Sequence, residues 1–138
     1  MRLELVRSLD DRLQRDLFGL FAQEWWSSDR SPSDIKKMLM HSDLVYGYSD
    51  PDTGQLAAFA RVLTDGIYKA VILDFIVAKT YRRTGLGRTL MKVIMEDPDL
   101  ASVRDFELYC KPELLPFYRR FGFIESDDDI KLLRSRRP

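Results

Sequence analysis

A strand-like apolar run that ends in a basic, glycine-containing turn constrains the fold of this chain most. Residues 70–78 read Ala-Val-Ile-Leu-Asp-Phe-Ile-Val-Ala, which is typical of a buried β-strand. The turn at residues 82–87 reads Arg-Arg-Thr-Gly-Leu-Gly, and an amphipathic helix begins within it. Glycines let a backbone approach an anion closely, consecutive N–H groups point at it, and a helix N-terminus adds its positive dipole end. The segment therefore predicts a diphosphate-binding cradle.

Composition limits the class of protein. The 138 residues are enough for one domain with a real core, and we expect residues 1–138 to form it. The 22 basic residues balance the 22 acidic ones, which argues against a general nucleic-acid binder. With one cysteine, Cys110, and one histidine, His41, we expect neither an internal disulfide nor a metal site. No signal peptide is evident and no apolar stretch approaches the ~20 residues that span a bilayer, so we expect a cytoplasmic protein without membrane contact.

Apolar periodicity predicts a mixed α/β order of elements. Strands are expected over residues 3–6, 44–48, 55–63, 68–78 and 106–110, with weak final strands over 123–125 and 130–133. Helices are expected over residues 13–25, from Pro32 behind a Ser31 cap, over 85–96 and over 112–121. Consecutive strands from residue 44 to 78 form an antiparallel meander, and the helix at 85–96 crosses over to the fifth strand.

A second motif lies some 30 residues after the turn. Residues 117–123 read Phe-Tyr-Arg-Arg-Phe-Gly-Phe. Together with the strand at 73–77 and the loop at 81–88, this motif makes the chain resemble the GNAT superfamily of acyl-CoA N-acyltransferases from about residue 45 to 123. Two motifs in the correct order and at the correct separation are more specific than either alone. The resemblance implies a mixed, mostly antiparallel sheet of six or seven strands and about four helices, splayed between strands 4 and 5.

The resemblance also implies acetyl-CoA as the cofactor and assigns its binding residues. The strand residues Phe75, Ile76 and Val77 would offer backbone groups to the thioester and the pantetheine arm. The loop residues that would present backbone N–H groups, or a hydroxyl, to the diphosphate are Arg82, Arg83, Thr84, Gly85, Leu86, Gly87, Arg88 and Thr89. Tyr118 matches the tyrosine that protonates the departing thiolate as a general acid. The N–H group of Phe75 would hold the oxyanion formed when the amine attacks.

The base and the acceptor pocket are less defined. Asp74 lies inside the apolar strand, on the face opposite Phe75, because strand side chains alternate. A charge there must be paired, hydrogen-bonded or facing a wet cleft, so Asp74 is a candidate base with a structural role as the alternative. Trp25 lies on the apolar helical face and is expected in the core. Trp26 lies off that face, and with Arg30 it is a candidate for the acceptor site.

The resemblance therefore implies an N-acetyltransferase in which a primary amine attacks acetyl-CoA directly, in a ternary complex that needs no metal. One alternative is a non-catalytic acyl-CoA-binding or regulatory module on the same fold. Another is a small nucleotide-phosphate-binding protein, against which the missing Lys-Ser/Thr of the phosphate loop counts. The chain after Phe123 is short, so a partner subunit in a homodimer could complete the sheet or the pocket.

Overall fold

One sheet of five strands forms the centre of the structure, a computed structural model that describes residues 2–126 and 129–138. The strands are β1 (Glu4–Val6), β2 (Leu44–Ser49), β3 (Leu56–Thr64), β4 (Lys69–Val77) and β5 (Asp105–Glu107). They lie side by side in chain order, so the predicted meander is confirmed. The first four strands pair antiparallel, and β5 pairs parallel to β4 after the predicted helical crossover.

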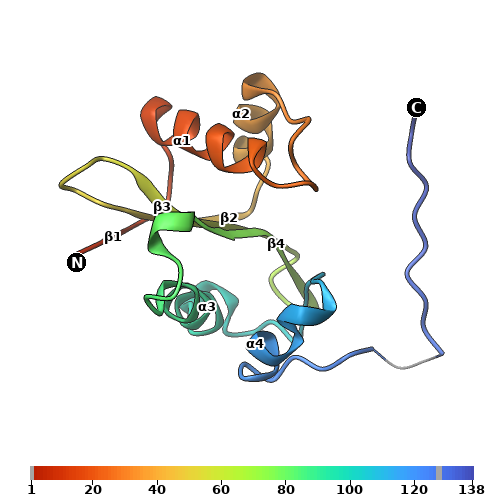
Figure 1. Cartoon of the computed structure of the whole chain (residues 1–138). Coiled ribbons are helices and arrows are strands. Elements are labelled where there is room, and N and C mark those ends of the chain that lie inside the picture. Colours follow the sequence, from red (N-terminus) through yellow and green to blue (C-terminus); the bar gives the residue numbers. More distant parts are fainter. Residues whose placement is uncertain (1, 127–128) are drawn as a thin grey trace.

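Helices cover both faces of the sheet. They are α1 (Asp11–Ala22), α2 (Pro32–Met40), α3 (Leu86–Met95) and α4 (Leu115–Arg119), with short 3-10 turns η1 (Lys79–Tyr81), η2 (Pro98–Leu100) and η3 (Pro112–Leu114). Figure 1 shows α1 and α2 on one side of the strands and α3 and α4 on the other. Two apolar clusters follow from this arrangement. Phe21 of α1 and Phe59 of β3 are fully buried between the sheet and the α1–α2 layer. Tyr46 of β2 and Leu90 of α3 are fully buried on the other face.

The helix starts follow their capping residues. The Asp10 side chain accepts a hydrogen bond from the Leu13 N–H at 2.9 Å and caps α1. Ser31 accepts from the Asp34 N–H at 3.2 Å ahead of Pro32, which confirms the predicted start of α2.

The prediction that Trp25 lies in the core is wrong. Helix α1 ends at Ala22, so the helical period stops before Trp25 and its side chain is 72% exposed. Trp26 instead turns inward, where its ring packs edge-on against Phe21 at 5.9 Å.

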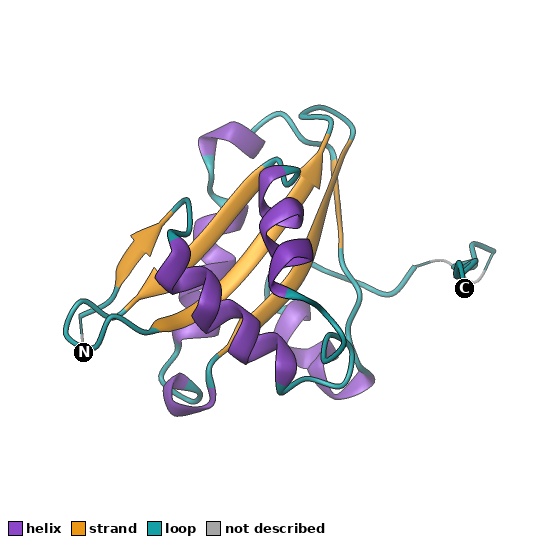
Figure 2. Ribbon diagram, turned by 90° about the horizontal axis from the view of Figure 1, so that it is seen from above, coloured by secondary structure: helices purple, strands orange, loops and turns teal. Residues whose placement is uncertain are grey.

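The predicted total of six or seven strands is also wrong. Residues 123–125 and 130–133 form no strand, and β5 is shorter than the predicted 106–110. A strand persists only where it pairs, and neither final segment pairs with a neighbour in the described chain. Ile124, Ile130 and Leu133 are accordingly exposed, and Figure 2 shows the C-terminal segment extending away from the sheet. Positions 127 and 128, between the two predicted final strands, lie outside the described residues.

Strand β4 has two irregularities that shape the site. Its pairing with β5 covers only residues 69–71, so the β5 side of residues 72–77 carries no paired strand in the described chain. This is the predicted splay. In addition, Asp74 and Phe75 together oppose the single residue Ala60 of β3, which is a β-bulge. Asp74 has a positive φ of 56°, and the bulge turns its side chain toward the α1–α2 face while Phe75 packs on the α3–α4 side.

Candidate active site

The loop between β4 and α3 presents a run of backbone N–H groups to solvent. In the part of the chain that the structure describes, the N–H groups of residues 83–88 meet no acceptor. Those of Arg82 and Thr89, on either side, donate to backbone carbonyls at 3.3 and 3.0 Å. Arg83 and Gly85 have positive φ values of 65° and 86°, the kind of turn that gathers successive N–H groups around an anion. The run of unengaged N–H groups therefore spans residues 83–88 and leaves out residues 82 and 89 of the predicted cradle.

Side chains of the loop hold its shape. The Arg82 Nε donates to the Val77 carbonyl at 3.0 Å, and a terminal nitrogen of Arg82 donates to Glu24 at 3.1 Å. The hydroxyls of Thr84 and Thr89 donate to backbone carbonyls at 2.5 and 3.1 Å. The side chains of these three predicted site residues are thus engaged within the protein, whereas those of Arg83 and Arg88 have no hydrogen-bond or ion-pair partner among the described residues.

Glycines and a helix N-terminus make the cradle suitable for a diphosphate. A Cβ at Gly85 would meet no atom within 4 Å, so the space beside it is open, while its φ excludes most other residues. A Cβ at Gly87 would only touch the Phe117 ring at 3.5 Å. Leu86, between them, is buried and anchors the start of α3, whose dipole favours an anion here. The residues present therefore fit the diphosphate of acetyl-CoA.

Tyr118 of α4 contacts Phe75, within the part of β4 whose β5-side edge carries no paired strand. Its ring lies 6.1 Å from Phe75 and 5.0 Å from Phe117, edge to face, and the residue is only 7% exposed. Its hydroxyl has no hydrogen-bond partner among the described residues, yet no fully buried polar side-chain atom there is unpartnered, so the oxygen reaches solvent. Burial, with a smaller effect of Cys110, raises the pKa of Tyr118 to about 12. The phenol stays protonated at neutral pH and can donate a proton.

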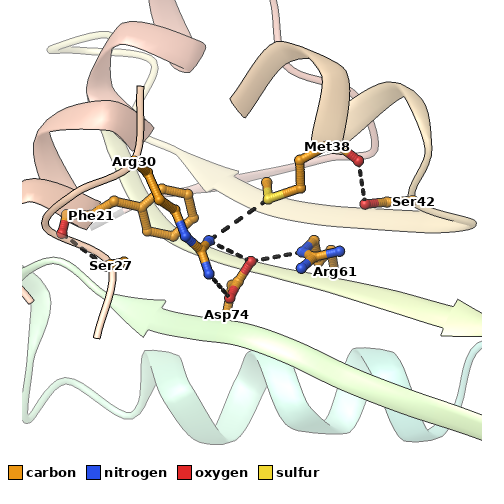
Figure 3. A network of polar contacts seen from close by, with 7 residues as sticks. All are labelled: Phe21, Ser27, Arg30, Met38, Ser42, Arg61 and Asp74. Atoms are coloured by element: carbon orange, nitrogen blue, oxygen red, sulfur yellow. Dashed lines mark hydrogen bonds and ion pairs between the residues drawn. The ribbon is translucent and has the colours of Figure 1, made fainter. Parts of the chain in front are cut away.

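Asp74 is held between two arginines from opposite sides (Figure 3). The two terminal nitrogens of Arg30 donate to its two oxygens at 2.8 and 3.0 Å, and the Arg61 Nε donates at 2.6 Å. The Asp74 side chain is 6% exposed. Burial acts to raise its pKa, but the hydrogen bonds and charges of both guanidinium groups prevail and the pKa lies below its ordinary value. The Asp74 carboxylate, bonded to both guanidinium groups, is therefore a weak proton acceptor.

We expect the variant Asp74→Asn to lower the free energy of unfolding at pH 7 by about 2 to 4 kcal/mol, because it leaves two half-buried guanidinium groups without their counter-ion. Asparagine tolerates the positive φ as aspartate does, so the backbone is matched. Because the folded pKa is depressed, the stabilisation by Asp74 is complete above the unfolded pKa near ~3.9 and is lost as the pH falls through the folded value.

Urea unfolding from pH 7 down to pH 3 measures this effect, and the gap between wild type and variant should shrink on the acid side. The control Glu107→Gln breaks an exposed ion pair with Lys69 and should leave stability nearly unchanged. An equal loss in both variants, or a gap independent of pH, would contradict a stabilising role for the Asp74 ion pair.

The two candidate residues for the acceptor site, Trp26 and Arg30, pack against each other and against Phe21. The Arg30 guanidinium lies over the Phe21 ring at 4.6 Å and near the Trp26 ring at 5.5 Å. Arg30 also borders a cavity of about 250 Å³ on the α2 side of the sheet, and Trp26 does not.

Sequence reasoning missed Arg61, although a lone arginine in the apolar strand 56–63 was a signal that a buried acid lies beside it.

Neither a membrane-spanning helix nor a cluster of metal-ligating side chains occurs among the described residues. No helix in them is long and apolar enough to cross a membrane. No group of three or more histidine, cysteine, aspartate or glutamate side chains is placed there to hold a metal ion.

The chain belongs to the GNAT family of acetyltransferases. A family model described as the acetyltransferase (GNAT) domain matches residues 13–132, which is most of the chain. The family resemblance seen in the sequence is thereby confirmed.

Curated relatives and solved structures agree with this assignment. The GCN5-related N-acetyltransferase 1, chloroplastic, of Arabidopsis thaliana is 33% identical over 102 residues, or 74% of this chain and 52% of that protein. The serotonin N-acetyltransferase 2, chloroplastic, of Oryza sativa subsp. japonica is 32% identical over 104 residues, with the same coverage. The chain thus spans about half the length of these relatives. A crystal structure from Xanthomonas campestris, assigned to the GNAT family, matches with a TM-score of 0.83 and 26% identity, covering 100% of this chain and 95% of that one.

Proposed function

We propose that this chain is an N-acetyltransferase that takes its acetyl group from acetyl-CoA and transfers it to a primary amine. The observation that carries the proposal is the run of free backbone N–H groups at residues 83–88, beside strand β4, whose β5-side edge carries no paired strand over residues 72–77. A diphosphate fits the free N–H groups, and the extended, amide-containing pantetheine arm fits the free edge of β4. Tyr118 lies across from that strand with its hydroxyl unengaged.

Each part of the donor then has its own binding residues. The N–H groups of residues 83–88 and the α3 N-terminus bind the diphosphate. The free edge of β4 hydrogen-bonds the pantetheine arm in the manner of an added strand. Bound acetyl-CoA supplies an acetyl group activated as a thioester. We assign to the Phe75 N–H, within the bulge, the stabilisation of negative charge on the carbonyl oxygen.

Three proton transfers complete the reaction, and one of them, the loss of the second proton of the attacking nitrogen as the C–S bond breaks, returns a proton to Tyr118 through water. Tyr118, protonated at neutral pH, donates to the sulfur that leaves. The attacking amine must lose a proton, because a lysine-like amine with a pKa near ~10.4 is mostly charged at pH 7. Asp74 is poorly suited to accept it, since both its oxygens are bonded to guanidinium groups. We therefore propose that water at the acceptor side takes the proton and that Asp74 positions Arg30 and Arg61.

Release of free thiol from acetyl-CoA, measured with a panel of primary amines, tests the proposal. The expected result is amine-dependent thiol release that saturates with both substrates. Binding of acetyl-CoA in a calorimetric titration, with no release across the panel, would instead favour the non-catalytic acyl-CoA-binding module. Equal protection from thermal unfolding by ADP and acetyl-CoA would favour a nucleotide-binding protein.

A further inference from the structure

The cavity of about 250 Å³ on the α2 side of the sheet has a defined chemical character. It is lined by Arg30, Asp34, Ile35, Met38 and Arg61. Ile35 and Met38 of α2 give it an apolar wall. Arg30 and Arg61 add two guanidinium groups to the lining, and both contact Asp74. The cavity therefore has room for a small organic molecule and a charged group to bind it.

Arg61 has hydrogen-bonding capacity that the protein does not use. Its Nε donates to Asp74 at 2.6 Å, but its two terminal nitrogens meet no acceptor among the described residues. Arg30, in contrast, donates hydrogen bonds from both of its terminal nitrogens to the Asp74 oxygens. Figure 3 shows the two guanidinium groups on either side of that carboxylate. The terminal fork of Arg61 is thus the part of the cluster that is free to bind a ligand.

The charges around the cluster also favour an anion. One carboxylate, Asp74, faces two guanidinium groups, so one positive charge is left over in a region where the Arg61 side chain is only 15% exposed. Asp34 lies on the exposed first turn of α2, where solvent screens its charge. A planar carboxylate accepts two parallel hydrogen bonds from an arginine fork, which is a strong and directional contact.

The cavity is linked to the proposed reaction centre through Asp74. Asp74, which both guanidinium groups contact, directly precedes Phe75, the residue whose N–H we assign to the thioester carbonyl. Arg61 thus contacts the bulge of β4 from the α1–α2 face, whereas the Phe75 side chain packs on the other face of the sheet. We propose that the acceptor is a small primary amine that also carries a carboxylate, and that the terminal nitrogens of Arg61 bind this carboxylate. The inference rests on the proposed acetyltransferase function.

Matched pairs of acceptors test the inference. The linear ω-amino acids from 3-aminopropanoate to 6-aminohexanoate are each compared with their primary amide, and kcat/KM is measured from thiol release. For the chain length that fits, wild-type protein should prefer the acid over its amide on the order of tenfold or more. The variant Arg61→Gln should lose this preference, and Arg61→Lys should keep only part of it, because it retains the charge without the fork.

Controls separate recognition from folding. The acid-to-amide ratio is taken within each variant, so differences in the amount of folded protein cancel. The variant Lys69→Gln removes a positive charge from an exposed ion pair on β4 and should keep the full preference. The variant Asp34→Asn removes a solvent-screened negative charge from the rim of the cavity and should leave the preference nearly unchanged. An acid-to-amide ratio near one at every chain length, or an unchanged ratio in Arg61→Gln, overturns the inference.

Failure of the inference differs from failure of the proposed function. Equal turnover of acids and amides overturns the carboxylate site and leaves the acetyltransferase proposal intact. If no amine gives thiol release, the catalytic proposal fails, and calorimetric titration with 4-aminobutanoate and 6-aminohexanoate decides the site by itself. Binding that is lost in Arg61→Gln then supports the carboxylate site, and absence of binding to wild-type protein overturns it.

Discussion

Replacing Gly85 with glutamate is expected to abolish acetyl-CoA binding. Gly85 sits in the middle of the free N–H groups at residues 83–88, and the space beside it is open. A carboxylate there would compete for the same donors and repel the diphosphate. Two charges ~4 Å apart near a protein surface repel by about 4 kcal/mol, which corresponds to a loss of affinity on the order of 10³-fold. Calorimetric titration with acetyl-CoA measures the loss.

A matched substitution controls for backbone strain and for added charge. Gly66, in the turn between β3 and β4, has a φ of 81° and open space around it, closely similar to Gly85. The variant Gly66→Glu therefore suffers the same strain and gains the same charge, but away from the cradle. It should bind acetyl-CoA as wild type does, whereas retained affinity in Gly85→Glu would contradict the cradle.

Replacing Tyr118 with phenylalanine is expected to lower kcat on the order of 10²-fold, as for removal of a general acid. The ring, which packs against Phe75 and Phe117, is retained, so the affinity for acetyl-CoA should change little. Because burial raises the pKa of Tyr118 to about 12, the loss should be nearly uniform between pH 6 and pH 10. Steady-state kinetics over this range, with acetyl-CoA affinity measured separately, checks the prediction.

Tyr48 provides the control for that experiment. It is 9% exposed and its hydroxyl likewise lacks a partner among the described residues, but it lies on β2, away from the splay. The variant Tyr48→Phe should keep the wild-type kcat. An unchanged kcat in Tyr118→Phe would reassign the proton donor, and equal losses in both variants would show a general effect of removing a buried hydroxyl.

Local signals in the sequence were enough for much of the fold. The cap at Ser31, the glycine turn before α3 and the apolar runs of β3 and β4 each act over a few residues, and all appear where predicted. Alternation along residues 74–77 also placed Asp74 opposite Phe75 correctly. It did not reveal the bulge, which shifts the alternation between Ile72 and Phe75, because a bulge depends on pairing with β3.

Features that depend on distant partners escaped the sequence analysis. The role of Arg61 needs both Asp74 from the next strand and Arg30 from the loop after α1, which only the tertiary structure brings together. The same holds for the final segments at 123–125 and 130–133. Their apolar residues suit a strand, but a strand needs a neighbour, and the described chain supplies none. Trp25 was misplaced because its helix ends three residues earlier.

A crystal structure with acetyl-CoA bound tests the central claim most directly. The account predicts that diphosphate oxygens lie within about 2.7 to 3.2 Å of backbone nitrogens in residues 83–88. It also predicts that the pantetheine arm runs along the free edge of β4 and that the sulfur lies near the Tyr118 hydroxyl. A diphosphate bound elsewhere, with the N–H groups of residues 83–88 still facing solvent, would contradict the account.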